Sequence, residues 1–267
     1  MNRLRARFAL KGLAPALLLL SAAACAGAGS EERLSVTTRT EAGTTTAPPA
    51  AEVAARKNAL ARFVHAVPGL ASVDLLAGDG KAFSGAAYKT ATAYVELPGA
   101  SGVYRLRLSG QETGEPLAEE KESFGAGGHH TIVAAPARAS GLLSKAAAAE
   151  LHFLADEFEA PAAGRARVRV FNASPDLDEV DLYASGRAVP LVKGAKFGAA
   201  TAYAEAEPAP AGLEVRRAGE NITTLNVPGQ KVEAGGLYTV FVVGGTKGAA
   251  GLEAFVVEDR LGPARPR

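Results

Sequence analysis

The stretch RVFNASPDLDEVDLY, residues 169–183, decides the fold because the chain carries a related stretch, RFVHAVPGLASVDLL, in residues 62–76. The two copies lie 107 residues apart and are identical at seven of 15 positions, and apolar residues stay apolar elsewhere in the match. The identical pairs are Arg62/Arg169, Ala66/Ala173, Pro68/Pro175, Leu70/Leu177, Val73/Val180, Asp74/Asp181 and Leu75/Leu182. This match indicates an internal duplication.

Three more matches extend the duplication toward the C-terminus. Residues 91–94 (ATAY) recur as residues 200–203, residues 128–133 (GHHTIV) as 236–241 (GLYTVF), and residues 153–155 (FLA) as 255–257 (FVV). The offsets are 109, 108 and 102 residues, and insertions or deletions in loops produce such small changes. We therefore expect two related domains, residues 58–160 and 165–261, followed by a disordered tail over residues 262–267.

Apolar residues in both copies recur at every second position. Val73, Leu75 and Ala77 follow this spacing in the first copy, and Val168 and Val170 follow it in the second. A period of two predicts strands, and short strands separated by turn signals predict an antiparallel sandwich. The predicted fold class is all-β, with two tandem Ig-like or transthyretin-like β-sandwich domains.

Turn and helix signals complete this prediction. Glycine in Gly78-Asp79-Gly80 and in Ser185-Gly186-Arg187 falls between strand-like runs and predicts tight hairpins. Leu142–Leu151 (LLSKAAAAEL) contains strong helix formers and predicts one short helix. The corresponding segment 245–252 is rich in glycine, so we expect no helix there.

The N-terminus has the order of a secretory signal peptide. Four basic residues without an acid precede the apolar run Leu13–Leu20, and small residues lead to Cys25, the only cysteine of the chain. Ser21–Cys25 (SAAAC) resembles a bacterial lipobox, although Ala22 stands where leucine is commoner. We predict a lipoprotein signal peptide over residues 1–24 and lipidation of Cys25. The alternative is a soluble secreted protein that is cleaved nearby.

Composition excludes some classes of partner. Removing residues 1–24 takes four of the 29 Lys and Arg residues, leaving 25 against 28 Asp and Glu, so the mature chain carries about −3 charges. A nucleic-acid partner is not expected, because such binding draws on a concentrated basic surface. Residues 25–57 are rich in Ala, Thr, Gly and Pro and predict a flexible tether. The expected partners are membrane lipid through acylated Cys25 and an envelope protein or polysaccharide.

The combined motifs resemble a known family. The second copy contains RVFNASPD, VDLY, FG and GLYTVFVVG, which together are similar to the bacterial domain of unknown function DUF4397. The first copy departs from this pattern, since Val67 and Gly69 stand in place of Ser174 and Asp176, and His129-His130 in place of Leu237-Tyr238. The resemblance implies a secreted or surface-attached tandem protein, and it implies no reaction.

The most distinctive polar cluster is a candidate ligand loop. It contains Asn172, Ser174 and Asp176 on either side of Pro175. The structural interpretation is a turn, because Ser and Asp bind nearby backbone groups and Pro favours the first turn position. The first copy supports the turn, since it keeps Pro68 but has Val67 and Gly69 in place of the serine and the aspartate.

Other polar residues predict no catalytic, cofactor or metal site. Asp74 and Asp181 should lie on the solvated face of a strand, opposite the neighbouring valine and leucine. His129 and His130 are adjacent on a predicted strand and should point to opposite faces, so they cannot readily hold one ion. No nucleophile motif or phosphate-binding loop is present either.

These observations favour a non-enzymatic, lipid-anchored protein of the bacterial envelope that serves binding, adhesion or scaffolding. Ala26 after the cysteine favours the outer membrane over inner-membrane retention, with the folded part in the periplasm or at the cell surface. The alternative is an accessory protein of polysaccharide modification, because Arg169–Asn172 (RVFN) is similar to a strand in the periplasmic accessory protein of alginate O-acetylation. An enzyme would need a cleft lined by residues such as Asn172, Asp176 and Asp181.

Overall fold

The computed structural model describes residues 57–97, 99, 101–138, 149–245 and 251–261, which form strands and turns with no helix among them. The first half contains β1 (Leu60–His65), β2 (Ser72–Ala77), β3 (Gly80–Ala87), β4 (Thr90–Ala91), β5 (Val95–Glu96), β6 (Ser101–Leu108), β7 (Ala118–Ser123), β8 (His129–Pro136) and β9 (Ala149–Ala155). The second half contains β10 (Ala166–Asn172), β11 (Glu179–Ala184), β12 (Pro190–Lys196), β13 (Ala204–Ala206), β14 (Leu213–Arg217), β15 (Thr223–Val227), β16 (Leu237–Val243) and β17 (Glu253–Glu258). We call β1–β9 the first module and β10–β17 the second module.

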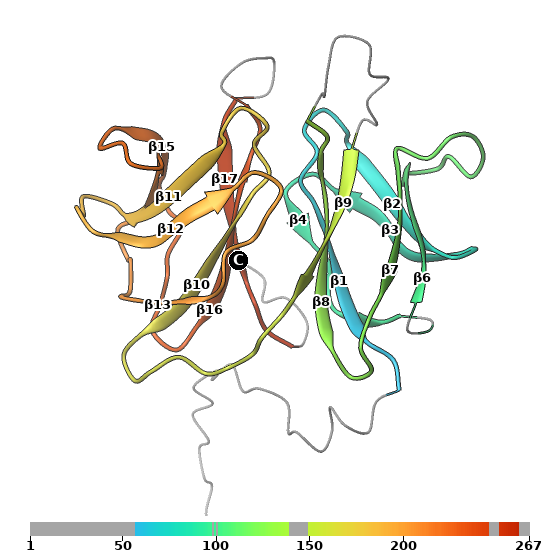
Figure 1. The fold of residues 1–267 in the computed structure, drawn as a ribbon, viewed down its shortest axis with the longest axis horizontal. Helices are drawn as coiled ribbons and strands as arrows, with labels where there is room; N and C mark the ends of the chain where they lie inside the picture. The colour runs from blue at the N-terminus through green and yellow to red at the C-terminus, as the bar shows by residue number, and fades with distance from the viewer. Residues whose placement is uncertain (1–56, 98, 100, 139–148, 246–250, 262–267) are drawn as a thin grey trace, which may run out of the picture. The chain divides into compact units, whose positions relative to one another are not determined.

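Each module has two sheets, and the strand order is the same in both modules (Figure 1). The inner sheets have the orders β4-β1-β8-β9 and β13-β10-β16-β17, with β5 also paired to β1. The outer sheets have the orders β3-β2-β6-β7 and β12-β11-β14-β15. The predicted all-β sandwich fold is confirmed, and the duplication extends to the topology.

One strand pair in each inner sheet is parallel. β1 runs parallel to β8, and β10 runs parallel to β16. The outer sheet lies between these partners in sequence, and it provides the long crossover connection that parallel strands require. Alternation of apolar residues alone does not distinguish this mixed sheet from the antiparallel one that the sequence predicts.

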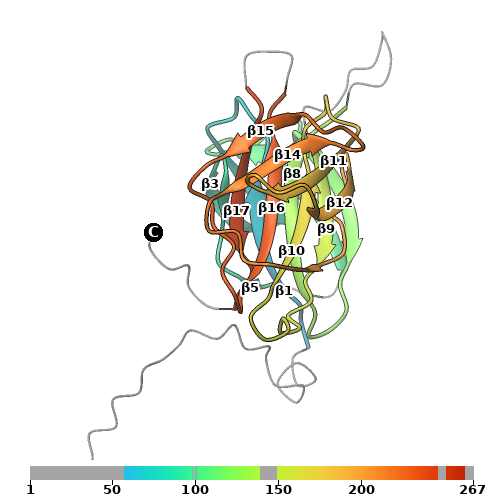
Figure 2. The same cartoon turned by 90° about the vertical axis from the view of Figure 1, so that its left-hand side faces the viewer.

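Each module has its own apolar core between its two sheets. In the first module, Phe63, Leu75, Leu106 and Ile132 are fully buried in this core. The corresponding core of the second module is built largely from valine and leucine of β10, β11, β14 and β16. Figure 2 shows the outer strands β11 and β14 in front of the inner strands of the second module. The alternating apolar residues therefore face the core of their own module.

A third apolar cluster joins the two inner sheets through their other faces. It is composed of Val64, Ala66, Val133, Ala135, Phe171, Ala173, Phe241, Val243 and Phe255. All seven residues of β16 are buried as a result. A strand that is buried on both faces needs apolar side chains on both, which accounts for the continuous apolar run Val240–Val243.

Several sequence predictions need correction or fall outside the described residues. Ala149–Leu151, the end of the predicted helix, begins strand β9, because Ala149 and Leu151 pack in the first-module core and pair with β8. The rest of that segment (139–148), the signal peptide with Cys25, the tether up to residue 56, the loop 246–250 and the tail 262–267 lie outside the described residues. The predicted hairpin at Gly78-Asp79 is confirmed between β2 and β3.

Candidate functional site

Eight polar side chains lie together where the two inner sheets meet, and we call them the inter-module network. Each module contributes one arginine, one threonine, one tyrosine and one aspartate. The members are Arg62, Tyr94, Thr131 and Asp156 from the first module, and Arg169, Tyr203, Thr239 and Asp259 from the second. The parallel pairing of β1 with β8 and of β10 with β16 places each arginine beside its threonine.

Within each module, the aspartate accepts hydrogen bonds from its own threonine and tyrosine. In the first module, the Tyr94 hydroxyl donates to Asp156 at 2.7 Å and the Thr131 hydroxyl at 2.8 Å. In the second module, the corresponding bonds to Asp259 measure 2.7 and 2.6 Å. The arginine Nε donates to the threonine hydroxyl at 2.8 Å in both modules. Both aspartates are therefore oriented from inside their own module.

Across the modules, each arginine pairs with the aspartate of the other module. Arg62 bonds Asp259, and Arg169 bonds Asp156, so two reciprocal ion pairs cross the interface. The Arg169 guanidinium also donates to the carbonyl oxygen of Ala155 at 2.8 Å. An exchange of this kind, in which residue i contacts j and j contacts i, is the property of a two-fold symmetric interface. The chain thus contains an intramolecular pseudo-dimer.

The charged groups of this network are almost fully removed from solvent. Arg62 and Arg169 are 2% and 3% exposed, and the carboxyl groups of Asp156 and Asp259 are fully buried. Burial alone would raise the pKa of Asp156, but the positive charges of Arg169 and Arg62 lower it below the ordinary value. Burial likewise opposes the charge on Arg62, yet Asp259 and other acidic groups raise its pKa. Asp156 and the two arginines therefore stay ionised at neutral pH.

The sequence comparison missed the two aspartates because of a one-residue shift. The match between residues 153–155 and 255–257 has an offset of 102, whereas the strand registers set Phe153 equivalent to Val256, an offset of 103. A shift of one residue moves every side chain of a strand to its other face. With the offset of 103, Asp156 coincides with Asp259. The repeated ATAY segment was the other available signal, since it contains Tyr94 and Tyr203.

The candidate ligand loop forms a closed turn. Asn172 and Ser174 are fully buried, and only Asp176 retains partial exposure. The Asn172 amide donates to the carbonyl oxygens of Leu177 at 2.9 Å and Ala195 at 3.3 Å, and its oxygen accepts from the backbone of Ser174 at 3.0 Å. These bonds support the structural interpretation of the turn, and the prediction of a ligand contact here stays untested.

His65 takes the place of Asn172 in the first module and makes two of the three corresponding bonds. Its Nδ1 accepts from the backbone N–H of Val67 at 3.2 Å, and its Nε2 lies 3.0 Å from the carbonyl oxygen of Leu70. Because the carbonyl can only accept, the proton is on Nε2, and the ring is neutral. Burial lowers the pKa of His65 accordingly.

Replacing His65 by asparagine should make stability less dependent on pH. Because the pKa of folded His65 is lowered, the unfolded chain binds the proton first, and stability is lost as the pH falls below about 6.5. We expect His65→Asn to reduce the decrease in the free energy of unfolding between pH 7 and pH 5, measured by urea denaturation. The reverse change, Asn172→His, is the matched control and should make the free energy of unfolding more dependent on pH. An unchanged pH dependence in His65→Asn would contradict the conclusion that the folded His65 ring is held neutral.

Asp74 and Asp181 are buried, which corrects the expectation of a solvated strand face. They are 4% and 7% exposed. Asp74 accepts a hydrogen bond from the backbone N–H of Gly85, and Asp181 accepts one from Gly194, both at 2.8 Å. Both glycines have positive φ and lie beside register shifts in the neighbouring strand. The aspartate of the V-D-L motif therefore satisfies the backbone of a β-bulge.

The two adjacent histidines lie on strand β8 as predicted, and aromatic rings surround them. His130 lies 4.4 Å from the ring of Phe124, and His129 lies edge-on to Tyr94 and Phe158 at 6.2 and 5.2 Å between ring centres. Within the described part of the chain, no group of three or more His, Cys, Asp and Glu is placed to hold a metal ion. No helix among these residues is long and apolar enough to cross a membrane.

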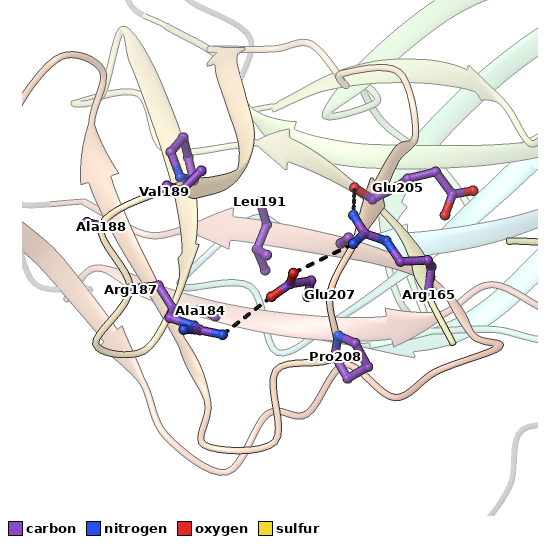
Figure 3. A pocket seen from close by; sticks show the side chains of 11 residues that line it. Arg165, Ala184, Arg187, Ala188, Val189, Leu191, Glu205, Glu207 and Pro208 are labelled. Atoms are coloured by element: carbon purple, nitrogen blue, oxygen red, sulfur yellow. Dashed lines mark hydrogen bonds and ion pairs between the residues drawn. The ribbon is translucent and has the colours of Figure 1, made fainter. Parts of the chain in front are cut away.

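The second module has an open pocket between the edge strands β12 and β13, which we call the second-module pocket (Figure 3). Its volume is about 570 Å³. Glu207 lies between two guanidinium groups, at 3.7 Å from Arg165 and 3.4 Å from Arg187. The apolar lining comes from Ala184, Ala188, Val189, Pro190, Leu191, Ala206 and Pro208.

Two properties make this pocket the candidate binding site. Val189 at its rim is 76% exposed and is one of three large apolar side chains that are exposed among the described residues. The two arginines share the Glu207 carboxylate at distances longer than those of a bidentate pair, and Arg165 also donates to the backbone carbonyl of Glu205 at 3.4 Å, so neither guanidinium has a close bidentate partner here. The Glu205 carboxylate points away from the pocket (Figure 3) and accepts a bond from the backbone of Ala162. The pocket can therefore accept an acidic group beside an apolar one.

No curated protein matches this chain. The family model of the domain of unknown function DUF4397 matches it twice, over residues 59–183 and 166–267. The two matches together span both modules and most of the chain. The protein therefore belongs to the DUF4397 family and carries this domain in tandem.

Proposed function

We propose that this protein is a non-enzymatic, lipid-anchored component of the bacterial cell envelope that binds a partner through the second-module pocket. Cys25 would carry the lipid, and residues 25–57 would act as the tether to the membrane. The two modules would form one scaffold that presents the pocket. The partner is an envelope protein or polysaccharide that offers an acidic group next to an apolar one.

The observation that carries this proposal is the pair of arginines that share Glu207 beside an exposed valine at the second-module pocket. Arg187 and Val189 are accessible without any change of the fold, since the Arg187 side chain is 67% exposed and Val189 is 76% exposed. The first module has Asn58 at the position of Arg165, bonded to Glu96 at 2.9 Å. The pocket chemistry thus differs between the two copies, whereas the inter-module network is the same in both.

The inter-module network supports a role without catalysis. Ionisable groups with shifted pKa values often mark active sites. In this protein, the shifted groups Arg62, Asp156 and Arg169 are hydrogen-bonded to one another's modules inside the interface. Such groups can hold two modules together, and they offer no free acid or base to a substrate.

The test is a quantitative pull-down from crosslinked, solubilised envelopes with the intact lipoprotein as bait. We expect one stoichiometric partner, and we expect Arg187→Ser or Val189→Ser to reduce its recovery at least tenfold. Ile222→Ser is the matched control, because Ile222 is 75% exposed and is not part of the pocket lining. Equal recovery with all variants would place the binding elsewhere.

The same preparations test the anchor separately. Metabolic labelling with a fatty acid should mark the native chain, and Cys25→Ser should remove both the label and the partition into the membrane fraction. Binding at the pocket should survive this change in detergent extracts. A native chain without label would contradict the lipid anchor and leave the pocket result standing.

A further inference from the structure

At the interface between the two modules, the charged side chains are arranged symmetrically, but the side chains around them differ in volume between the modules. Both modules contribute the same arginine, threonine, tyrosine and aspartate. The apolar positions around this network differ, because the second module has three phenylalanines where the first has smaller or polar side chains. The equivalent pairs are Val64/Phe171, Val133/Phe241 and His152/Phe255.

The large side chains of the second module face smaller or polar side chains of the first. The ring of Phe171 meets the ring of His152 at 5.3 Å between centres. The position related by the pseudo-two-fold sets Phe255 against Val64, and both belong to the same buried cluster. If two second modules paired in this way, Phe255 of each module would face Phe171 of the other, at both symmetric positions. The added volume would overpack the interface.

A pairing of two first modules meets a different obstacle, which lies at the position that Gly198 occupies in the second module. A Cβ atom at Gly198 would lie 3.2 Å from Cε1 of His152, so the absence of a side chain allows the close approach. The first module has Lys89 at the equivalent position, and this residue keeps the same positive φ. The Lys89 side chain would therefore stand against His152 at both symmetric positions.

Two further contacts across the interface have no symmetric counterpart among the described residues. Arg138 of the first module bonds Asp178 at 2.9 Å and lies 4.2 Å above the ring of Phe197. Lys89 pairs with Glu253 of the second module, whereas the symmetric position has Gly198. A pair of second modules would lack the donors of both contacts.

We propose that the inner sheet of the second module is a docking surface specific for an inner sheet of the first-module type. The shared charges orient the two surfaces, and the unequal volumes exclude like from like. Its partner is the first module of the same chain. This specificity does not depend on the ligand of the second-module pocket.

The experiment uses the full chain with a protease site in place of residues 160–163, which lie in the connection between the modules. The chain is folded first and then cut, and native mass spectrometry counts the species. We expect the halves to remain together as a one-to-one complex at micromolar concentration. Dissociation into separate monomers would overturn the proposal.

A refolding experiment then tests which modules pair with each other. The cut halves are dissolved in urea and refolded together by dilution. Specific docking predicts mixed pairs in at least tenfold excess over pairs of like modules. A statistical mixture, in which half of the pairs are alike, would overturn the proposal, and so would monomers alone.

Gly198→Lys gives a second readout that does not depend on refolding. This change introduces the first-module residue against His152 and leaves the inter-module network unaltered. We expect at least tenfold weaker association of the two halves after cutting. Gly219→Lys is the matched control, since Gly219 also has positive φ and nothing lies within 4 Å of its Cβ position. Equal weakening by both variants would show that backbone strain, and not the interface, determines the effect.

Discussion

Replacing Arg169 by methionine should lower the free energy of unfolding by about 3–5 kcal/mol. The change leaves the buried carboxylate of Asp156 without its partner from the other module, and it removes the bond to the Ala155 carbonyl. Removing one member of a buried ion pair costs more than the pair itself contributes, because the remaining charge stays desolvated. Urea or thermal unfolding of the intact chain measures the loss.

Two comparisons separate this effect from a general loss of arginine. Arg167→Met on the same strand removes a pair with Glu159, whose side chain is 78% exposed, and should cost about 1 kcal/mol or less. The double change Arg169→Met with Asp156→Leu should regain part of the stability, because no unpaired charge remains. If Arg169→Met cost no more than Arg167→Met, the reciprocal pairs would contribute nothing to the interface.

Replacing Phe241 by alanine should cost about 3–5 kcal/mol. Phe241 is fully buried in the cluster between the inner sheets, and its ring centre lies 5.1 Å from that of Phe255 and 5.9 Å from that of Phe171. Removing it leaves a cavity that two neighbouring rings can only partly fill. The same unfolding measurement applies, with folding checked by circular dichroism.

Val133 and Val189 provide matched controls for this prediction. Val133 occupies the equivalent position in the first module, and Val133→Ala removes less volume from the same cluster, so its cost should be clearly smaller. Val189→Ala changes an exposed side chain and should stay within about 0.5 kcal/mol. Equal values for Phe241→Ala and Val189→Ala would mean that the two modules do not pack through this cluster in solution.

The sequence predicts the fold well because duplication and alternation are local, repeated signals. The VDL strands, the Gly78-Asp79 hairpin and the turn at Pro175 follow from residues that lie close together in the chain. The packing of one module on the other produces a weaker signal in the sequence. The continuous apolar run of β16 contains that information, since alternation should stop where the second face of a strand is also buried.

The candidate sites were harder to predict, because they depend on residues far apart in sequence. Arg62 and Asp259 come from opposite ends of the folded part, and the offset of 102 set Asp156 out of register with its counterpart. The helix prediction at Ala149–Leu151 was wrong because pairing with β8 outweighs the helix propensity of alanine. The second-module pocket depends on edge strands whose approach no local pattern indicates.

The parallel pairing of β1 with β8 also has a consequence for the order in which the chain folds. Arg62 and Thr131 are 69 residues apart, so the first strand of each module gains its central neighbour only after the whole outer sheet has been synthesised. Closing so long a loop is entropically costly and slow. Until then, one edge of the first strand has no partner, since β4 and β5 in the first module and β13 in the second pair with its other edge. A nascent chain with an open apolar strand edge is prone to aggregate.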